Sequence, residues 1–341
     1  MSITGTLPLT IFQAGIESSP GTAVTATRKQ PMQGGTLVQH DERQMPVEQR
    51  GSLIRNYRTF VTKEYVELTG MPAYPTFEDL PWFLNHFAHS TWNNALPDTK
   101  NGVPTNVTAR KYSFAPAIGS DSLVTTTWEV GDQTQAYQVP FAVGAKMELG
   151  WSVGQPMTMT VDYLGKKATP VAFTSNLSDR VTEDINGALA AVYVDSTTIG
   201  STPVTNVLDF KVTLDNHFTQ FWALTGTINP QDVYRSESRS LVVEITAAFV
   251  NTTEFLAFQT NTSGLGTERK IRLQVTGSAI AGSVPAVSRT FNLDFYGYWQ
   301  EAPFDSADGL HVVKFKGESV YDAAAGNDWS MYVINAVSPL P

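Results

Sequence analysis

Residues 57–89 read YRTFVTKEYVELTGMPAYPTFEDLPWFLNHFAH, and they decide the fold because they predict a strand followed by a helix. Residues 57–68 are rich in β-branched and aromatic side chains, which is typical of a strand. Gly70 and Pro72 follow, and they predict that the strand ends in a turn at residues 69–72. We therefore expect a sheet to begin in this stretch.

The second part of the stretch predicts a helix with one apolar face. Asp79 is placed to cap the first free amides, and Pro81 falls in the first turn, where a missing N–H costs little. A helix of this length is marginal in water and is stabilised mainly by burial against other elements. The side chains expected to pack between helix and sheet recur at helical spacing: Leu80, Phe83, Leu84 and Phe87.

The same order of elements recurs later in the chain. Residues 241–249 predict a strand, and residues 251–254 resemble a capping box that opens a short helix. We expect further strands at 111–114, 123–130, 137–143, 147–151 and 157–163 after the first helix, and at 271–275, 291–296, 312–315 and 329–334 after the second. The predicted fold class is mainly β, with two tandem β-sandwich or barrel domains that each carry one short α-helix.

The boundary between the two domains is predicted in a stretch of turn-forming residues. Apolar and polar side chains alternate cleanly from Lys146 to Tyr163, which predicts a hairpin with one wet face. The alternation is lost in residues 164–186. We therefore expect a first domain at 1–168, including an extended N-terminal arm at 1–49, and a second domain at 169–341.

The bulk composition excludes several classes of protein. The 341 residues are 42% hydrophobic, which is ordinary for a soluble globular protein, and no stretch approaches the ~20 apolar residues of a membrane-spanning helix. Cysteine is absent, so the chain forms no disulfide. A net charge of -9 disfavours tight binding to nucleic acid, which needs a positive stripe, but permits DNA to slide past.

One motif favours a catalytic alternative. Residues 150–154, Gly-Trp-Ser-Val-Gly, match the nucleophile elbow of α/β-hydrolases, and Asp305, Asp308 and His311 follow Ser152 in the matching order. That elbow needs a helix after the serine, whereas residues 157–163 alternate as a strand does. We therefore favour a hairpin turn at Ser152 and keep an esterase as the alternative.

Metal and cofactor motifs are absent from the sequence. His86 and His89 are the only close pair among five histidines, and no H-E-x-x-H pattern accompanies them, so we expect solvated or loop-packed imidazoles. No phosphate-binding glycine motif occurs, so no cofactor is expected. Tyr296, Tyr298 and Trp299 predict core or interface anchors, or the sugar platform of a carbohydrate-binding β-sandwich module.

The first quarter of the chain carries a family resemblance. Glu17 is followed by Gly-Thr-Ala-Val at 21–24, then by Arg28 and Pro31, and later by P-T-F-E-D-L-P-W-F-L at 75–84. This series resembles the major tail tube proteins of long-tailed, siphovirus-type bacteriophages. The matching residues include no catalytic motif.

The resemblance implies a structural protein of the virion, present in the host cytoplasm during assembly. Members of this family close into rings whose inner strands form a β-barrel, and the rings stack into a tube that conducts viral DNA at infection. The implied partners are further copies of the chain, the tape measure protein, and terminator or tail-tip proteins. A related ring-forming tail component is a further alternative. If the wet face of the Lys146 to Tyr163 hairpin lines the lumen, Glu148 and Asp162 contribute to an acidic bore.

The length of the chain bears on the symmetry of the ring. Many tail tubes resemble rings of six single-domain subunits, and this chain is about twice the ~100–150 residues of one such domain. Because both halves predict a strand, a helix and further strands, one chain can fill two positions. We therefore favour a trimer over a hexamer in which the second half decorates the outside.

Overall fold

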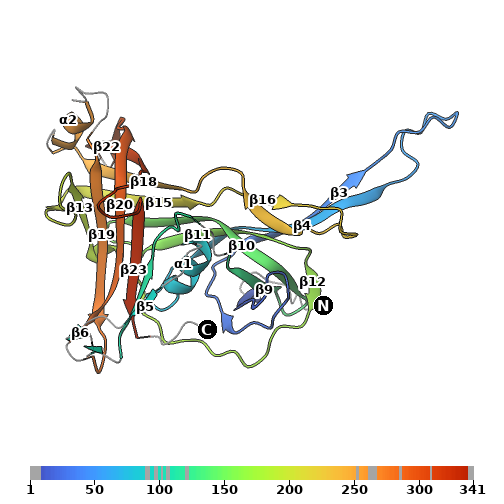
Figure 1. Ribbon diagram of the computed structural model, residues 1–341, viewed down its shortest axis with the longest axis horizontal. Coiled ribbons are helices and arrows are strands. Elements are labelled where there is room, and N and C mark those ends of the chain that lie inside the picture. Colours follow the sequence, from blue (N-terminus) through green and yellow to red (C-terminus); the bar gives the residue numbers. More distant parts are fainter. Residues whose placement is uncertain are drawn as a thin grey trace.

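The computed structural model describes residues 9–88, 93–95, 99–100, 103–104, 108–119, 123–250, 253–259, 267–283, 286–307 and 309–336. The predicted fold class is confirmed, because this part of the chain is mainly β and has two α-helices (Figure 1). Neither helix has the length and apolar character that a membrane crossing requires, within the described residues.

The first half of the chain carries strands β1–β12 and helix α1. Their bounds are β1 Ile11–Ile16, β2 Arg28–Lys29, β3 Thr36–Gln44, β4 Phe60–Ala73, α1 Leu80–Ala88, β5 Asn93–Ala95, β6 Thr99–Lys100, β7 Val103–Pro104, β8 Arg110–Phe114, β9 Thr125–Gly131, β10 Ala136–Ser152, β11 Thr158–Gly165 and β12 Thr169–Val171.

The second half opens with a 3-10 turn at Gly187–Leu189 and carries strands β13–β23 and helix α2. Their bounds are β13 Ala190–Asp195, β14 Pro203–Val204, β15 Val207–Asp215, β16 Phe218–Phe221, β17 Asp232–Arg235, β18 Ser240–Ala248, α2 Thr253–Gln259, β19 Arg269–Ala279, β20 Ser288–Glu301, β21 Phe304–Ala307, β22 Leu310–Ser319 and β23 Trp329–Asn335.

The two halves pair their strands in the same order. In the first half, β3 pairs with β4, β4 with β11, β11 with β10, β10 with β9, β9 with β1 and β1 with β2. In the second half, β15, β18, β22, β20, β19, β13 and β14 follow one another in the same way. Each strand of the first series therefore has a counterpart in the second, and the helix follows the corresponding strand, β4 or β18, in both.

The two halves share one continuous antiparallel sheet. The end of β10 pairs with β15, from Lys146 opposite Asp215 to Ser152 opposite Asp209. Eight strands thus lie side by side in the order β3, β4, β11, β10, β15, β18, β22, β20. On one face of this sheet the apolar side chains are buried, as at Leu149 and Val212, whereas the other face carries polar side chains.

Strand β10 belongs to two sheets and bends between them. Its first part pairs with β9 and β12, and its second part with β11 and β15. The register shifts between Val139 and Ala142, where Phe141 has a positive φ of 57°. Residues 137–143 and 147–151, predicted as two strands, are therefore one bent strand, which turns at a β-bulge.

The predicted turn at residues 69–72 is wrong, because β4 runs on to Ala73. The register between β4 and β11 shifts on either side of Gly70, whose φ is 57°. The Gly70 N–H donates to Asp162 Oδ1 on β11 at 2.7 Å. A glycine that signals a turn in the sequence thus forms a bulge inside a long strand.

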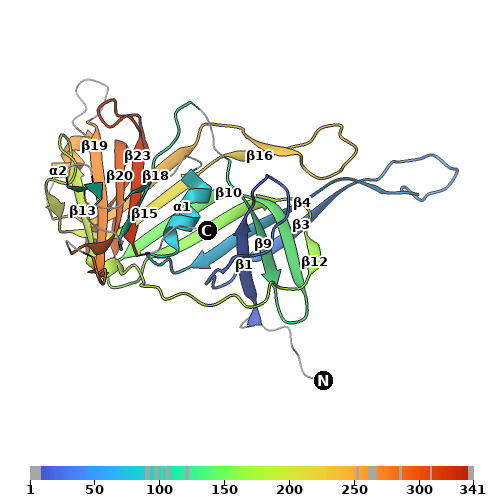
Figure 2. The same cartoon turned by 60° about the horizontal axis from the view of Figure 1, so that its bottom comes forward.

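Helix α1 is buried on every side, which differs from the single apolar face that we expected. Leu80, Phe83, Leu84 and Phe87 lie in the core, and so do the polar residues Asn85 and His86. The helix contacts β10 on one side and β8 and β23 on another (Figure 2).

Residues of the second half bind the C-terminal end of α1. Asn216 Nδ2 donates to the Phe87 carbonyl at 3.0 Å, and Arg239 donates to the Ala88 carbonyl at 2.6 Å. These contacts satisfy carbonyls that have no partner inside the helix.

Three further strand pairings involve the N-terminal segment, the region of the predicted boundary and the two halves. Strand β1 pairs with β9 along its whole length, so residues 11–16 belong to the core and not to a separate arm. Strand β12 begins at Thr169 and still pairs with β10 in the first half. In addition, β8 pairs with β23 of the second half. Strand pairs thus cross between the two halves.

Gly144 allows α1 to approach β10, and this contact gives a first prediction. A Cβ atom at Gly144 would lie 2.9 Å from the Phe87 ring and 3.0 Å from the His86 carbonyl. We expect Gly144→Ala to lower the free energy of unfolding by about 1–3 kcal/mol, because the core must shift to make room. Chemical denaturation measures this change. The control Gly34→Ala, which has no heavy atom within 4 Å of the new Cβ, should change stability little.

Candidate assembly surfaces

Two of the residues that carry the family resemblance, Glu17 and Gly21, bind each other. Glu17 is buried, and its carboxylate accepts hydrogen bonds from the Gly21 and Phe141 amides at 2.7 and 2.8 Å. It also accepts from the hydroxyls of Thr125 and Thr127, each at 2.8 Å. One carboxylate therefore fixes the turn at 17–21 and the bend of β10, the latter through Phe141.

The two separate stretches of the resemblance meet at Asp79. The buried Arg28 guanidinium donates to Asp79 Oδ1 at 2.7 Å and lies 5.0 Å from the centre of the Trp82 ring. Arg180 donates to the same oxygen at 2.5 Å. Burial raises the pKa of Asp79 to about 6, against a hydrogen bond from Thr76, so the carboxylate is still ionised at pH 7 and can pair with both guanidinium groups.

These contacts correct the predicted role of Asp79. The sequence predicts that its carboxylate caps the free amides of α1, but the carboxylate binds Arg28, Arg180 and Thr76. The Asp79 N–H itself donates to Thr76 Oγ1 at 3.1 Å. Asp79 therefore joins β2, α1 and the connection between the halves, a role that local sequence does not signal.

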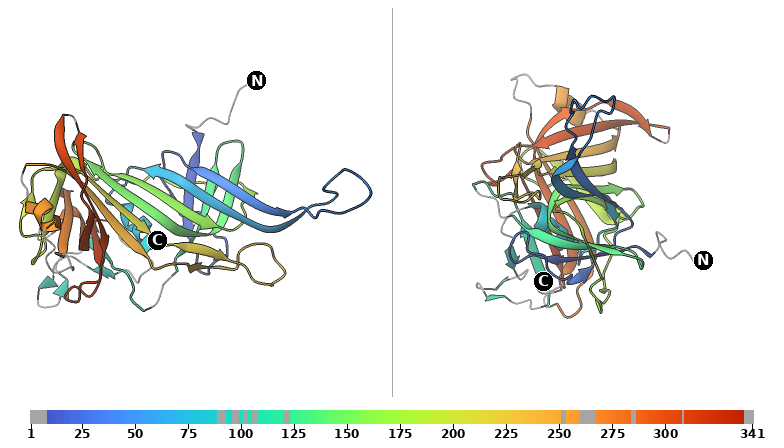
Figure 3. Two further views of the ribbon diagram at one scale, coloured as in Figure 1. Left: turned by 90° about the horizontal axis from the view of Figure 1, so that it is seen from above. Right: turned by 90° about the vertical axis from the view of Figure 1, so that its right-hand side faces the viewer.

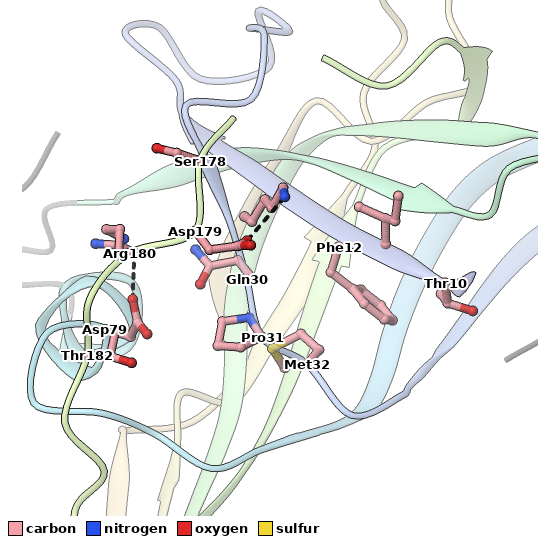
Figure 4. A pocket seen from close by; sticks show the side chains of 12 residues that line it. Thr10, Phe12, Gln30, Pro31, Met32, Asp79, Ser178, Asp179, Arg180 and Thr182 are labelled. Atoms are coloured by element: carbon pink, nitrogen blue, oxygen red, sulfur yellow. Dashed lines mark hydrogen bonds and ion pairs between the residues drawn. The ribbon is translucent and has the colours of Figure 1, made fainter. Parts of the chain in front are cut away.

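A cavity of about 380 Å³ opens beside Asp79 (Figure 4). Gln30 is buried and lies at this cavity, and Lys29 forms an ion pair with Asp179 at 3.1 Å near its rim. The labelled side chains come from β1 and the residue before it, from the segment after β2, from Asp79 before α1, and from the connection at 178–182. The cavity thus lies where residues 178–182, in the connection between the halves, pack on the first half.

Glu148 and Asp162 both lie on the polar face of the shared sheet. Glu148 is held between Lys146 at 2.8 Å and Lys211 at 3.0 Å. Partial burial raises the pKa of Glu148, but the two lysine hydrogen bonds outweigh burial and the net pKa is lowered. Asp162 binds the Gly70 amide. Two ammonium groups thus face the Glu148 carboxylate, and Lys146 also lies close enough to Asp162 and Asp215 to interact with their charges.

Ser152 lies where a hairpin turns, and the geometry does not match a nucleophile elbow. The Gln155 N–H donates to the Ser152 carbonyl at 3.1 Å, and the next element is the strand β11. His311 lies on β22, three strands away from β10 across β15 and β18, which corresponds to roughly 14 Å at the usual strand spacing. Asp305 pairs with Lys314, and Asp308 lies outside the described residues.

The other candidate ligand residues lie in the core. His86 is fully buried between Trp82 and Tyr163, so the expectation of a solvated imidazole is wrong for it, while His89 lies outside the described residues. No cluster of three metal-ligating side chains occurs in the described part of the chain. Tyr296 and Trp299 are buried and Tyr298 is half-buried, and Trp299 packs on Phe315, so these residues form no exposed sugar platform.

The shared sheet ends in two edges. Strand β3 forms one edge, and β20 continues into β21 along the other. Among the described residues, β3 pairs with β4 alone, and β21 pairs with β22 alone. Phe304 on β21 is 54% exposed. An unpaired sheet edge is a template for pairing with another chain.

Two hairpins project from the same end of the molecule (Figures 1 and 3). One is the tip between β3 and β4, and the other is formed by β16 and β17. Both carry exposed apolar side chains, which on a projecting element mark an interaction site. These side chains are Met45, Val47, Leu53, Ile54, Phe60, Phe221, Leu224 and Tyr234. Sequence reasoning missed the tip of the first hairpin, because Met45 and Val47 fall in the predicted arm at 1–49 and no periodic pattern marks Leu53 or Ile54.

The buried ion pair of Arg28 gives a second prediction. We expect Arg28→Met to lower the free energy of unfolding by up to about 3–5 kcal/mol, because a buried carboxylate loses one of its two cationic partners. Thermal and chemical denaturation measure the loss. The neighbouring Lys29→Met removes an exposed ion pair and should cost only about 0–1 kcal/mol, so equal losses in both variants would contradict the role given to Arg28.

The turn at Ser152 gives a third prediction. Ser152→Ala should leave folding, self-association and any ester hydrolysis by the purified protein unchanged, because β15 and β18 separate the strand of Ser152 from that of His311. Turnover of a chromogenic ester that disappears in a correctly folded variant would revive the esterase alternative.

No protein-family model and no curated protein sequence matches the chain.

Proposed function

We propose that the chain is the structural subunit of a bacteriophage tail tube, which forms rings that stack and conduct viral DNA. The observation that carries this proposal is the sheet that the two equivalent halves share. Its edge strands, β3 and β20 with β21, correspond by strand order to β15 and β10, and these two strands already pair with each other inside the chain. The resemblance of residues 17–31 and 75–84 to tail tube proteins supports the same function.

The pairing of β10 with β15, which we call the seam inside the chain, indicates how copies join. By strand order, β15 is the counterpart of β3, and β10 is the counterpart of β20 with β21. Within the chain, Leu149 on β10 lies opposite Val212 on β15. The counterparts of these two residues are Phe304 and Leu37, so β3 of one copy would pair with β21 of the next with these side chains opposite each other.

Ring symmetry follows from this pairing. Each chain supplies two equivalent positions, so a closed ring with six positions contains three chains. Such closure would pair both edges of the shared sheet, which removes the hazard of uncontrolled pairing along them. A hexamer would instead need one half of each chain to stay outside the wall, where the seam between β10 and β15 could not form part of it.

The polar face of the shared sheet is the candidate for the lumen. Glu148 and Asp162 lie there, and the carboxylate of Glu148 is compensated by two lysines. A bore whose charges are paired offers no continuous positive stripe, so passing DNA would release few counterions and bind weakly. The implied partners are the tape measure protein and terminator or tail-tip proteins, in the virion and earlier in the host cytoplasm.

The fourth prediction tests the ring. Purified protein should form rings or tubes in electron micrographs, and mass measurement of isolated rings should give three chains. Phe304→Lys should shift the assembly midpoint to at least tenfold higher concentration, because it places a charge at the proposed seam. The control Val181→Lys, at a residue 95% exposed on the connection between the halves, should assemble normally.

Other outcomes would contradict the proposal. A chain that stays monomeric at every concentration would overturn the tube function, and six chains per ring would overturn the trimer. A related ring-forming tail component would give rings that do not stack.

A further inference from the structure

The two projecting hairpins correspond in length and at their tips. The pair His40 and Tyr65 lies at the base of the first hairpin and the pair Asp215 and Ser240 at the base of the second, with the same number of residues between them. The tip glycines fall at the same position, Gly51 with φ 67° and Gly226 with φ 80°.

The hydroxyl beside each tip glycine makes the same turn. Ser52 Oγ accepts from the Ile54 amide at 3.1 Å, and Thr227 Oγ1 accepts from the Asn229 amide at 3.0 Å. Leu53 is therefore the counterpart of Ile228, Met45 of Gln220, and Val47 of Trp222.

The second hairpin is docked on the first half of its own chain. The Glu64 amide on β4 donates to the Ile228 carbonyl at 2.9 Å, and Gln220 donates to the Gly165 carbonyl at 3.3 Å. The Lys63 ammonium lies 4.5 Å from the centre of the Trp222 ring, and Tyr65 packs edge-on against Trp222. This hairpin thus reaches across the seam and covers the place where β11 ends beside β4.

The first hairpin leaves the corresponding side chains exposed. Leu53 is fully exposed, and Met45 and Val47 are more than half exposed. The second hairpin docks where β11 ends beside β4. By strand order, the equivalent surface in the second half lies where β22 ends beside β18. Lys63, Glu64 and Gly165 have their counterparts there in Ser238, Arg239 and Ser319, and these three residues line an open cavity of about 440 Å³.

The cavity has a fixed floor and an apolar rim. Arg239 donates to the carbonyls of Ala88 and Ala117 at 2.6 and 3.3 Å, which ties the floor to α1 and to the segment after β8. Ile118 and Tyr321 line the cavity and are mostly exposed. Leu53 and Ile54 of the first hairpin offer apolar side chains of matching character.

We propose that this cavity receives the β3–β4 hairpin of a second copy, in the way in which the β16–β17 hairpin covers the first half within one chain. The inference rests on the proposed function, because it needs copies joined through β3 and β21. That pairing places the hairpin of one copy beside β22 of the next, at whose end Ser319 lies. The hairpin of one copy then covers the seam between the two copies, and its partner is another copy of this chain.

Thiol crosslinking tests the proposal, since the chain contains no cysteine. Leu53→Cys and Ser238→Cys are purified separately, mixed under assembling conditions and treated with a short bis-maleimide. We expect a crosslinked dimer on denaturing gels from the mixture and from neither protein alone. The double variant Lys63→Cys with Ile228→Cys is the internal reference, and it should crosslink within one chain. The mixture of Leu53→Cys with Val181→Cys is the matched control and should stay monomeric on the gel.

The outcomes separate the hairpin contact from the ring itself. Rings in the micrographs with a positive internal reference and no product between positions 53 and 238 would overturn the hairpin contact and leave the tube function standing. Absence of rings together with absence of product would overturn both. An equally strong product with the Val181 control would show random collision and would also overturn the contact.

Discussion

The pairing of β10 with β15 is the interaction on which the rest of the structure depends. Each half would otherwise expose a row of unpaired amides and carbonyls at this place, and such an edge invites aggregation. Pairing them joins the two halves into one sheet. The bend of β10 makes this possible, since its first part stays with β9 while its second part reaches β15. Glu17 holds that bend by binding the Phe141 amide.

Helix α1 makes the two halves depend on each other further. It is buried on every side, and its last carbonyls accept hydrogen bonds from Asn216 and Arg239 in the second half. A first half on its own would expose apolar side chains such as Phe83 and leave those carbonyls to water. The close approach at Gly144 ties the same helix to β10. The repeat is therefore visible in the order of the strands, whereas the two halves of the chain share one hydrophobic core.

Much of the fold was readable from periodicity, because alternation along a strand and the helical spacing from Leu80 to Phe87 are local properties. The errors have a common cause. Gly70 and Pro72 predict a turn, but the same residue types also occur in a bulge inside a strand. Only the hydrogen bond from Gly70 to Asp162, which is distant in the sequence, shows that a bulge forms here. Likewise, the two cationic partners of Asp79 come from residues 28 and 180, which are distant from it in the sequence. The exposed hairpin tips were missed because no periodic pattern covers Met45 to Ile54, and their equivalence to the second hairpin emerges only from strand register.

The covalent connection between the halves has a consequence for mass action. In a ring of three chains, half of the seams are the internal pairing of β10 with β15, which forms at the high effective concentration of a linked segment. In such a ring, only the remaining seams, which join different chains, would depend on protein concentration. Fewer molecules would then have to meet to nucleate a ring than if six separate single-domain units assembled. The link also frees the two hairpins to differ in sequence: Trp222 packs against Tyr65 of its own chain, whereas the exposed Leu53 would make its contact only when copies meet in the proposed assembly.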